Sequence, residues 1–217
     1  KISYGYTEPG TTTSLGRITT ANTIVNGVTK YTTTYSYEAG LNGSSTHRLS
    51  SVNNNGNVLS YTYDANGNIK TFTRNGYTRN YYYNELNELT RDDDPITGRT
   101  MVYSYDVGGN ITSKTIYAYT TVTNPTNPVS TIYYTYGDAN WKDKLTAYNG
   151  IAIASDSIGN VTDDGTYTYA WEEGNQLASM AKKDGSQNIS FKYNADGIRT
   201  EKTVNGVTTD YRVVGGK

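Results

Sequence analysis

The sequence has no cysteine and few of the residues that fill a conventional core. Only 35% of its 217 residues are hydrophobic even with tyrosine counted, and phenylalanine and methionine occur twice each. The mean hydropathy of -0.69 is low for a folded domain. The lack of cysteine excludes a disulfide framework and a thiolate metal site. It leaves the redox compartment open, because a cysteine-free chain suits either side of a membrane.

Charge of one sign and long apolar runs are also scarce. The net charge is -1, which supplies no cationic footprint for phosphates, so we expect neither a nucleic-acid partner nor an anionic membrane surface. No run reaches the length of a transmembrane helix, so membrane insertion is not expected. Because the chain opens at Lys1 rather than Met and stops at Lys217, just after a strand-like stretch, we expect a fragment of a longer protein.

Tyrosine and threonine dominate instead. The chain has 23 Tyr, and both residue types favour strands, while low charge with many aromatics argues against disorder. No segment has a convincing amphipathic helical pattern. The nearest, from Trp171 to Gly185, follows an alternation of Tyr167, Tyr169 and Trp171 that leads into a turn. The sequence therefore predicts an all-β fold.

A short turn motif, "YDANGNI" from Tyr63 to Ile69, carries the clearest local signal. Asp is favoured at the first position of a type I turn and Gly at the fourth, where φ is positive; Asp64 and Gly67 fit these places. Such a turn is a common hairpin connection with a bulge. The strand that carries Tyr61 and Tyr63 should reverse into one that starts near Ile69.

Near-copies of this motif recur at intervals of roughly 20 residues, which indicates an internal repeat of one hairpin per unit. They read "YNELNEL", "YDVGGNI", "WEEGNQL" and "YNADGIR", with degenerate versions at Tyr136 and Ser155. The residues that define the repeat are Tyr61, Tyr63, Asp64, Gly67, Asn68, Ile69, Tyr81, Tyr83, Leu89, Tyr103, Tyr105, Asp106, Gly109, Asn110, Ile111, Tyr169, Trp171, Leu177, Tyr193, Asn194 and Gly197.

A second kind of turn brings the chain back between copies. Asn-Gly is the strongest short hairpin signal, and it stands at Asn26-Gly27, Asn75-Gly76 and Asn205-Gly206. Longer loops are expected at the same topological place at 92–98 and 124–128. Tyr4, Tyr6, Tyr35 and Tyr37 suggest earlier units with longer turns.

In each Tyr-x-Tyr strand the two rings should share one face, and the residue between them should point to the other. One face is then aromatic and the other largely polar. Tyr side chains of successive units could stack into cross-strand ladders of roughly 0.2–1 kcal/mol per pair, with hydroxyl groups free to reach water. A sheet of this kind needs no second layer, so we expect no two-layer hydrophobic core and two exposed sheet edges open to self-association.

The strings "YTYDANGNIKTFTRNG", "YSYDVGGNITSKT" and "YNADGIRTEKTVNGVTTDY" resemble the YD repeats of the Rhs, teneurin and Tc-toxin BC-component families. The resemblance is strong over 61–111 and 167–211, with degenerate units at 1–60 and 119–160. It implies that residues 1–217 are one YD-repeat segment. It implies a continuous curved sheet strip, largely one layer thick, wound in relatives into a hollow shell that can enclose a C-terminal toxin. It also implies flanking YD repeats as partners and a secreted or cell-surface bacterial location.

The residues that could form a catalytic or metal site are also residues that commonly occur in turns. His47, with Ser44 and Ser45 nearby, is interpreted as a solvated loop histidine rather than part of a triad. The string from Asp94 to Gly98 has the wrong spacing for the autoproteolytic motif that the resemblance implies. Carboxylates that could pair for glycoside hydrolysis are assigned to turns; they are Asp92, Asp93, Asp94, Asp163, Asp164, Glu172 and Glu173.

The sequence thus predicts no catalytic residue, no cofactor and no metal site, although a calcium site at 92–94 is an alternative. The predicted function is a structural segment of a YD-repeat shell. The alternative is a carbohydrate- or cell-surface-binding repeat module, with exposed rings such as Trp141 and Trp171 stacking on sugars. A hydrolase with unrecognised residues is a third possibility.

Overall fold

The computed structural model describes residues 1–6, 15–40 and 44–212, and in this part of the chain every regular element is a β-strand. No helix that could cross a membrane is present among these residues. The longer turns expected after Tyr6 and Tyr37 fall at 7–14 and 41–43, outside the described residues. The all-β prediction is confirmed.

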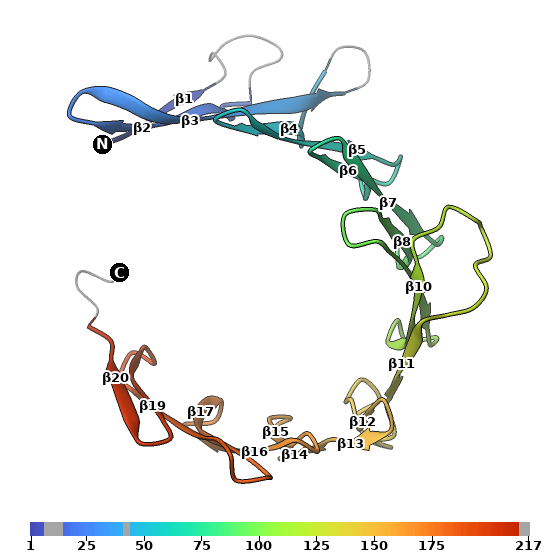
Figure 1. The fold of residues 1–217 in the computed structure, drawn as a ribbon, viewed down its shortest axis with the longest axis vertical. Coiled ribbons are helices and arrows are strands. Elements are labelled where there is room, and N and C mark those ends of the chain that lie inside the picture. Colours follow the sequence, from blue (N-terminus) through green and yellow to red (C-terminus); the bar gives the residue numbers. More distant parts are fainter. Residues whose placement is uncertain (7–14, 41–43, 213–217) are drawn as a thin grey trace. The chain divides into compact units, whose positions relative to one another are not determined.

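The strands form two sheets in which each strand pairs with its neighbours in the chain (Figure 1). The 13-stranded sheet consists of β1 (Ile2–Tyr6), β2 (Ile18–Val25), β3 (Val28–Ala39), β4 (Ser45–Asn54), β5 (Asn57–Tyr63), β6 (Ile69–Arg74), β7 (Tyr77–Tyr83), β8 (Leu89–Asp94), β9 (Arg99–Tyr105), β10 (Ile111–Ala118), β11 (Ser130–Thr135), β12 (Ala147–Tyr148) and β13 (Ile151–Ala152). The seven-stranded sheet consists of β14 (Ala154–Ser155), β15 (Val161–Asp163), β16 (Tyr167–Glu172), β17 (Gln176–Lys182), β18 (Asn188–Tyr193), β19 (Arg199–Val204) and β20 (Val207–Asp210).

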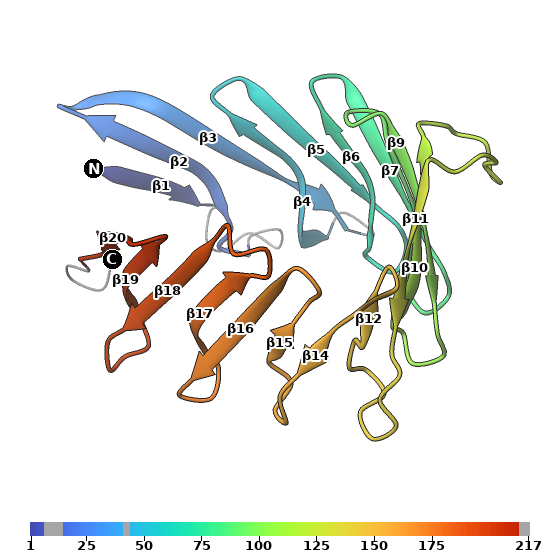
Figure 2. The same cartoon turned by 60° about the horizontal axis from the view of Figure 1, so that its bottom comes forward.

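The chain divides into two compact units, described separately below. The first comprises residues 1–104 and 114–131, and the second comprises 105–113 and 132–217. Within the first unit Figure 2 shows the hairpins from β4 to β7 side by side. Because consecutive strands are antiparallel, Asp-type turns lie at one rim of the sheet and Asn-Gly turns at the opposite rim.

Strand register follows the repeat. Tyr61 pairs with Phe72 and Tyr63 with Ile69, and Phe72 in turn pairs with Arg79 across the Asn75-Gly76 turn. The pairing of the strand that carries Tyr61 and Tyr63 with the strand that starts at Ile69 is the one that the sequence predicts. The register shifts by one residue just before Tyr63, and equivalent bulges precede Tyr37, Tyr83, Trp171 and Tyr193.

Neither unit has a dry apolar interior. Among the described residues no hydrophobic side chain is buried, as the scarcity of aliphatics predicts. Burial alternates along the Tyr-x-Tyr strands: in the β5 strand Tyr61 and Tyr63 are half-buried while Thr62 between them is exposed. The buried residues are polar or charged and lie in β8 and β9; they are Arg91, Asp92, Asp93, Asp94 and Thr100.

Candidate functional site

The Asp-type turn is closed by the same backbone bonds in copy after copy. At the first turn the Gly67 N–H donates to the Asp64 carbonyl (3.1 Å), and the Asp64 N–H donates to the Asn68 carbonyl (3.0 Å). Gly67 has φ of 91° and Gly109 has φ of 84°, as the type I turn with a positive fourth position requires. Turns with this bonding also begin at Asn84, Asp106, Asp156 and Asn194.

The acidic side chain fixes the loop from within. Asp64 Oδ1 accepts hydrogen bonds from the backbone N–H groups of Asn66 (3.0 Å) and Asn68 (2.8 Å), and Asp64 Oδ2 accepts one from Asn68 Nδ2 (3.0 Å). The bond from the Asn68 side chain is the largest cause that lowers the pKa of Asp64. In the second copy the roles are exchanged: Asn84 Nδ2 donates to Glu88 Oε2 at 2.6 Å.

Some turns are also tied to the next one by side-chain hydrogen bonds. Asn66 Nδ2 and Asn68 Nδ2 both donate to Asn87 Oδ1 at 2.9 Å, which joins two successive turns of the first unit. In the second unit Asn160 Nδ2 donates to the Gly174 carbonyl at 2.6 Å. Polar side chains of the repeat therefore hold neighbouring hairpins in register at this rim.

The second aromatic of several repeats donates a hydrogen bond that the sequence did not predict. Tyr63 Oη donates to the Leu49 carbonyl (2.8 Å), Tyr83 Oη to Ile69 (3.0 Å) and Tyr193 Oη to Leu177 (3.1 Å). The Trp171 indole N–H makes the equivalent bond to the Val161 carbonyl at 2.7 Å. At these positions the side chain donates to a backbone carbonyl of the preceding strand, which the expectation of hydroxyls free to reach water did not include. The sequence signal for this bond is the aromatic residue directly before the Asp of the repeat, a position occupied by Trp at Trp171.

The expected ladders of stacked Tyr rings form in part. Ring pairs across neighbouring strands join Tyr61 to Phe72 and Tyr134 to Tyr148, with centroids 5.4 Å apart in each pair. Elsewhere a guanidinium lies over a ring, as with Arg17 over Tyr37 at 4.3 Å and Arg48 over Tyr63 at 5.3 Å. A cation over an aromatic face is attracted by the ring quadrupole.

Trp171 differs from the other copies in its turn. The loop after it has the same length, since Glu172 pairs with Gln176 and Trp171 with Leu177. Positive φ, however, occurs at Glu173 (45°) and Gly174 (83°), earlier in the loop than at Gly67. The "WEEGNQL" stretch is therefore a hairpin of another turn type. By contrast the "SDSIGNV" stretch has both backbone bonds of the Asp-type turn at Asp156, although Ser155 replaces the aromatic residue before the Asp.

The acidic run at 92–94 does not lie in a turn as expected, because β8 extends to Asp94. Successive strand residues face opposite sides, so Asp92 and Asp94 lie on one face and Asp93 on the other. Asp92 is 1% exposed and accepts from Arg79 Nε at 2.6 Å, and the Arg79 guanidinium is also 3.4 Å from Asp94 Oδ2. The bond to Asp92 is the main reason that the pKa of Arg79 is raised.

On the opposite face Arg91 holds a long loop against the sheet. Its Nε donates to Asp93 Oδ1 at 2.7 Å. Its terminal nitrogens donate to loop carbonyls of Thr120 (2.9 Å), Val122 (2.6 Å) and Thr123 (2.8 Å). Thr100 Oγ1 lies 3.0 Å from Asp93 Oδ1 and 2.9 Å from the Thr120 carbonyl. We call residues 119–124 together with Arg91, Asp93 and Thr100 the Arg91 clamp.

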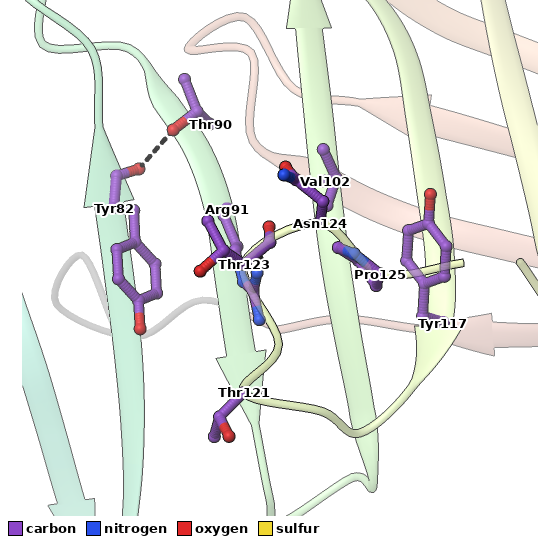
Figure 3. A pocket seen from close by; sticks show the side chains of 9 residues that line it. All are labelled: Tyr82, Thr90, Arg91, Val102, Tyr117, Thr121, Thr123, Asn124 and Pro125. Carbon is purple, nitrogen blue, oxygen red and sulfur yellow. Dashed lines mark hydrogen bonds between the residues drawn. The ribbon is translucent and has the colours of Figure 1, made fainter. Parts of the chain in front are cut away.

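A cleft of about 460 Å³ opens beside the Arg91 clamp (Figure 3). Tyr82 and Tyr117 stand at its two sides, and the loop residues Thr123, Asn124 and Pro125 lie between them. Burial, followed by the nearby Asp93 carboxylate, raises the pKa of Tyr82. The remaining lining residues are Thr90, Arg91, Val102 and Thr121.

The other candidate residues have structural surroundings. His47 lies in the β4 strand rather than in a loop, and it is exposed. Asp163 and Glu172 end the β15 and β16 strands, contrary to their assignment to turns, while Asp164 and Glu173 lie between strands. Asp94 Oδ1 accepts from the N–H groups of Ile96 (2.9 Å) and Thr97 (3.2 Å), so it caps the turn that follows it. Within the described ranges no group of three or more His, Asp or Glu side chains is placed to hold a metal ion.

Comparison with known proteins identifies the repeat. The family model of the Teneurin YD-shell matches residues 11–124. The tRNA nuclease WapA of Bacillus subtilis (strain 168) is 38% identical over 73 residues, which is 33% of this chain and 3% of that protein. The tRNA(Glu)-specific nuclease WapA of Bacillus subtilis subsp. natto matches to the same extent.

Solved structures share the fold. A crystal structure of TcdB2-TccC3-Cdc42 matches with a TM-score of 0.56 at 15% identity, covering 96% of this chain and 14% of that one. The Tc holotoxin pore of Photorhabdus luminescens matches with a TM-score of 0.52 at 16% identity, covering 89% of this chain and 12% of that one. The chain thus spans a small part of each relative.

Proposed function

The chain belongs to the Teneurin YD-shell family, and from this we propose that it is a stretch of shell wall that encloses a C-terminal toxin or effector domain of a longer bacterial protein. The observation that carries the proposal is the sequential pairing of strands without any buried hydrophobic side chain among the described residues. A domain that stood alone would be expected to bury apolar residues in a core of its own.

A wall one sheet thick has water or cargo on both faces, so its side chains must hold it together within the sheet. The bonds between turns and the Tyr hydroxyl bonds to the preceding strand do this at several repeats. For example, Asn68 Nδ2 reaches Asn87 in the next turn and Tyr83 Oη reaches Ile69 in the preceding strand. These contacts repeat along the strip, as an extendable wall requires.

We propose no catalytic role for the chain itself. Its most buried acids, Asp92 and Asp93, are engaged by Arg79 and Arg91, and Asp64 and Asp106 close turns. The relatives named as tRNA nucleases match over only 3% of their length. Incubation of the purified chain with tRNA should leave the RNA intact, and cleavage that survives repurification would overturn this assignment.

The partners proposed are flanking YD repeats and an enclosed toxin domain of the same polypeptide, and the location proposed is secreted or at the bacterial surface. We treat residues 1–217 as one YD-repeat segment of that polypeptide. The outer strands of the two sheets are β1, β13, β14 and β20, and we propose that neighbouring strands would continue the sheets at β1 and β20.

Limited proteolysis of the longer protein tests enclosure. The C-terminal domain should be cut far more slowly within the intact protein than when it is expressed alone. Gly67→Val combined with Arg91→Met should speed its cleavage, whereas Arg74→Met, at an exposed arginine, should not. Equal cleavage rates in the intact protein and the isolated domain would show that the strip does not enclose it.

A further inference from the structure

We propose that the cleft beside the Arg91 clamp binds a neutral saccharide of about two rings. This activity is independent of the shell role, since it concerns one cleft in the first unit. The volume of about 460 Å³ lies in the range of small-molecule sites and exceeds the need of a single hexose.

Two tyrosines supply the stacking surfaces. Tyr82 is 46% exposed although it lies mid-strand, because the adjacent Tyr81 and Tyr83 occupy the opposite face. Arg91 lies over its ring at 5.6 Å and helps to fix it. Tyr117 faces the cleft from the β10 strand on the other side (Figure 3). Rings with one apolar face and a polar tip suit the C–H faces and hydroxyls of a pyranose.

The polar side chains that line the cleft offer a ligand no free charge. Thr90, Thr121, Thr123 and Asn124 provide hydroxyl and amide groups that can both donate and accept. The one charged lining residue, Arg91, is 9% exposed, and each of its three nitrogens is engaged by Asp93 or by a loop carbonyl. An anionic ligand would therefore find no available cation in this lining, whereas a polyol finds partners without burying a charge.

The cleft is formed before any ligand arrives. The bonds from Arg91 to Thr120, Val122 and Thr123 fix the loop wall, and Thr100 Oγ1 accepts the Thr120 N–H at 3.1 Å. A preformed site avoids the cost of ordering a loop on binding. Sequence reasoning pointed to Trp141 and Trp171 for sugar stacking, but Trp171 uses its indole N–H within the sheet.

The test is a titration of the isotopically labelled 217-residue chain with cellobiose, maltose, N,N′-diacetylchitobiose and digalacturonate, followed by NMR. At least one neutral disaccharide should give saturable shifts of the Thr121, Thr123 and Asn124 amides below roughly 20 mM. Digalacturonate should bind at least about fivefold more weakly than that sugar, because the lining offers no free cation.

Variants separate the cleft from general surface binding. Tyr117→Ala should weaken the binding at least about fivefold, and Tyr117→Phe should stay within about twofold because the ring remains. Tyr77→Ala removes a ring that is 56% exposed and lies outside the cleft, and it should change nothing. Circular dichroism and urea unfolding of each variant exclude misfolding as the cause of a loss.

Three outcomes overturn the proposal: no saturable shift with any of the neutral sugars, equal loss in Tyr77→Ala and Tyr117→Ala, or tighter binding of digalacturonate. Saturable binding of a polyproline peptide at the same amides, without binding of the sugars, would assign the cleft to peptide recognition instead. None of these results bears on whether the longer protein encloses a toxin, which the proteolysis experiment measures separately.

Discussion

The β8–β9 hairpin and the β5–β6 hairpin have the same antiparallel pairing but differ in what covers them. In β5–β6 the side chains are at most half-buried, and single bonds of the repeat, such as Tyr63 to Leu49, hold the strands. In β8–β9 a loop from 29 to 32 residues away in the chain covers Arg91. Asp93 is 0% exposed, and its Oδ2 atom has no hydrogen-bond partner.

The difference shows two ways to stabilise a sheet that lacks an apolar core. The hydrogen bonds of the repeat, such as that from Tyr63 to Leu49, are exposed or half-exposed. Each therefore contributes little to the free energy of unfolding, and the fold should tolerate its loss. The Arg91 clamp removes charged groups from water, so it is stable only while every partner is present. Loss of a clamp residue should therefore destabilise the chain more than loss of a single bond of the repeat.

Arg91→Met should destabilise the chain most, by about 3 kcal/mol, because it leaves the buried Asp93 carboxylate without its cation. Urea unfolding monitored by tyrosine fluorescence measures the change. The matched variant Arg74→Met, at an exposed arginine, should stay within about 0.5 kcal/mol. Similar values for the two variants would show that the Arg91 clamp contributes no more than a surface contact.

Gly67→Val should cost about 1–2 kcal/mol, since Gly67 has φ of 91°, a conformation unfavourable for a β-branched residue. The space itself is adequate: the nearest atom to an added Cβ is Arg48 Nη1 at 3.5 Å. Ala65→Val in the same turn serves as the control and should have a smaller effect, because Ala65 has no positive φ. Thermal unfolding of the pair gives the difference, and an equal loss would contradict the backbone explanation.

Tyr63→Phe should cost about 1 kcal/mol, because it removes the hydrogen bond to the Leu49 carbonyl and leaves the ring in place. Tyr61→Phe keeps the contact of that ring with Phe72 and should be close to neutral. Chemical denaturation of both variants provides the comparison. If Tyr61→Phe is the more costly of the two, ring packing rather than the hydroxyl bond holds the repeat.

The smallest effect concerns pH. The pKa values of Asp64 and Asp106 are lowered, first by the side-chain bonds from Asn68 and Asn110. Their contribution to stability is therefore fully present above the ordinary carboxyl pKa of 3.8 and is lost as the pH falls below it. Asp64→Asn should flatten the decline of the urea midpoint between about pH 5 and pH 2.5.

The turn that begins at Asn84 provides a natural control for this pH effect. Its first residue is already an amide and cannot titrate, although Asn84 Oδ1 accepts the same backbone N–H bonds from Leu86 (3.0 Å) and Glu88 (2.9 Å). Hydrogen exchange of the Leu86 amide should change less with acid than exchange of the Asn66 amide. A larger change at Leu86 would contradict the assignment.

Much of the repeat could be predicted because its chemistry is local. Asp64 and Gly67 are three residues apart and specify their turn by their own conformational preferences, and Asn75-Gly76 does the same at the other rim. The alternation of Tyr61, Thr62 and Tyr63 fixes which side chains share a face. The bond of Tyr63 to Leu49 was missed, since it joins a side chain to a backbone carbonyl 14 residues away on the neighbouring strand.

The class of fold, the turns at Asp64 and Asn75-Gly76 and the pairing of consecutive strands follow from the sequence alone, because each depends on residues close together in the chain. Only the tertiary structure decided that Asp92 and Asp93 are buried in a strand and that Arg91 joins a loop to the sheet face. In the sequence an acidic run beside a proline has the composition of a solvated turn. Its burial depends on Arg79, 13 residues from Asp92, and on the loop carbonyls that Arg91 reaches 29 to 32 residues away. Such partners can be identified only once the fold has brought them together.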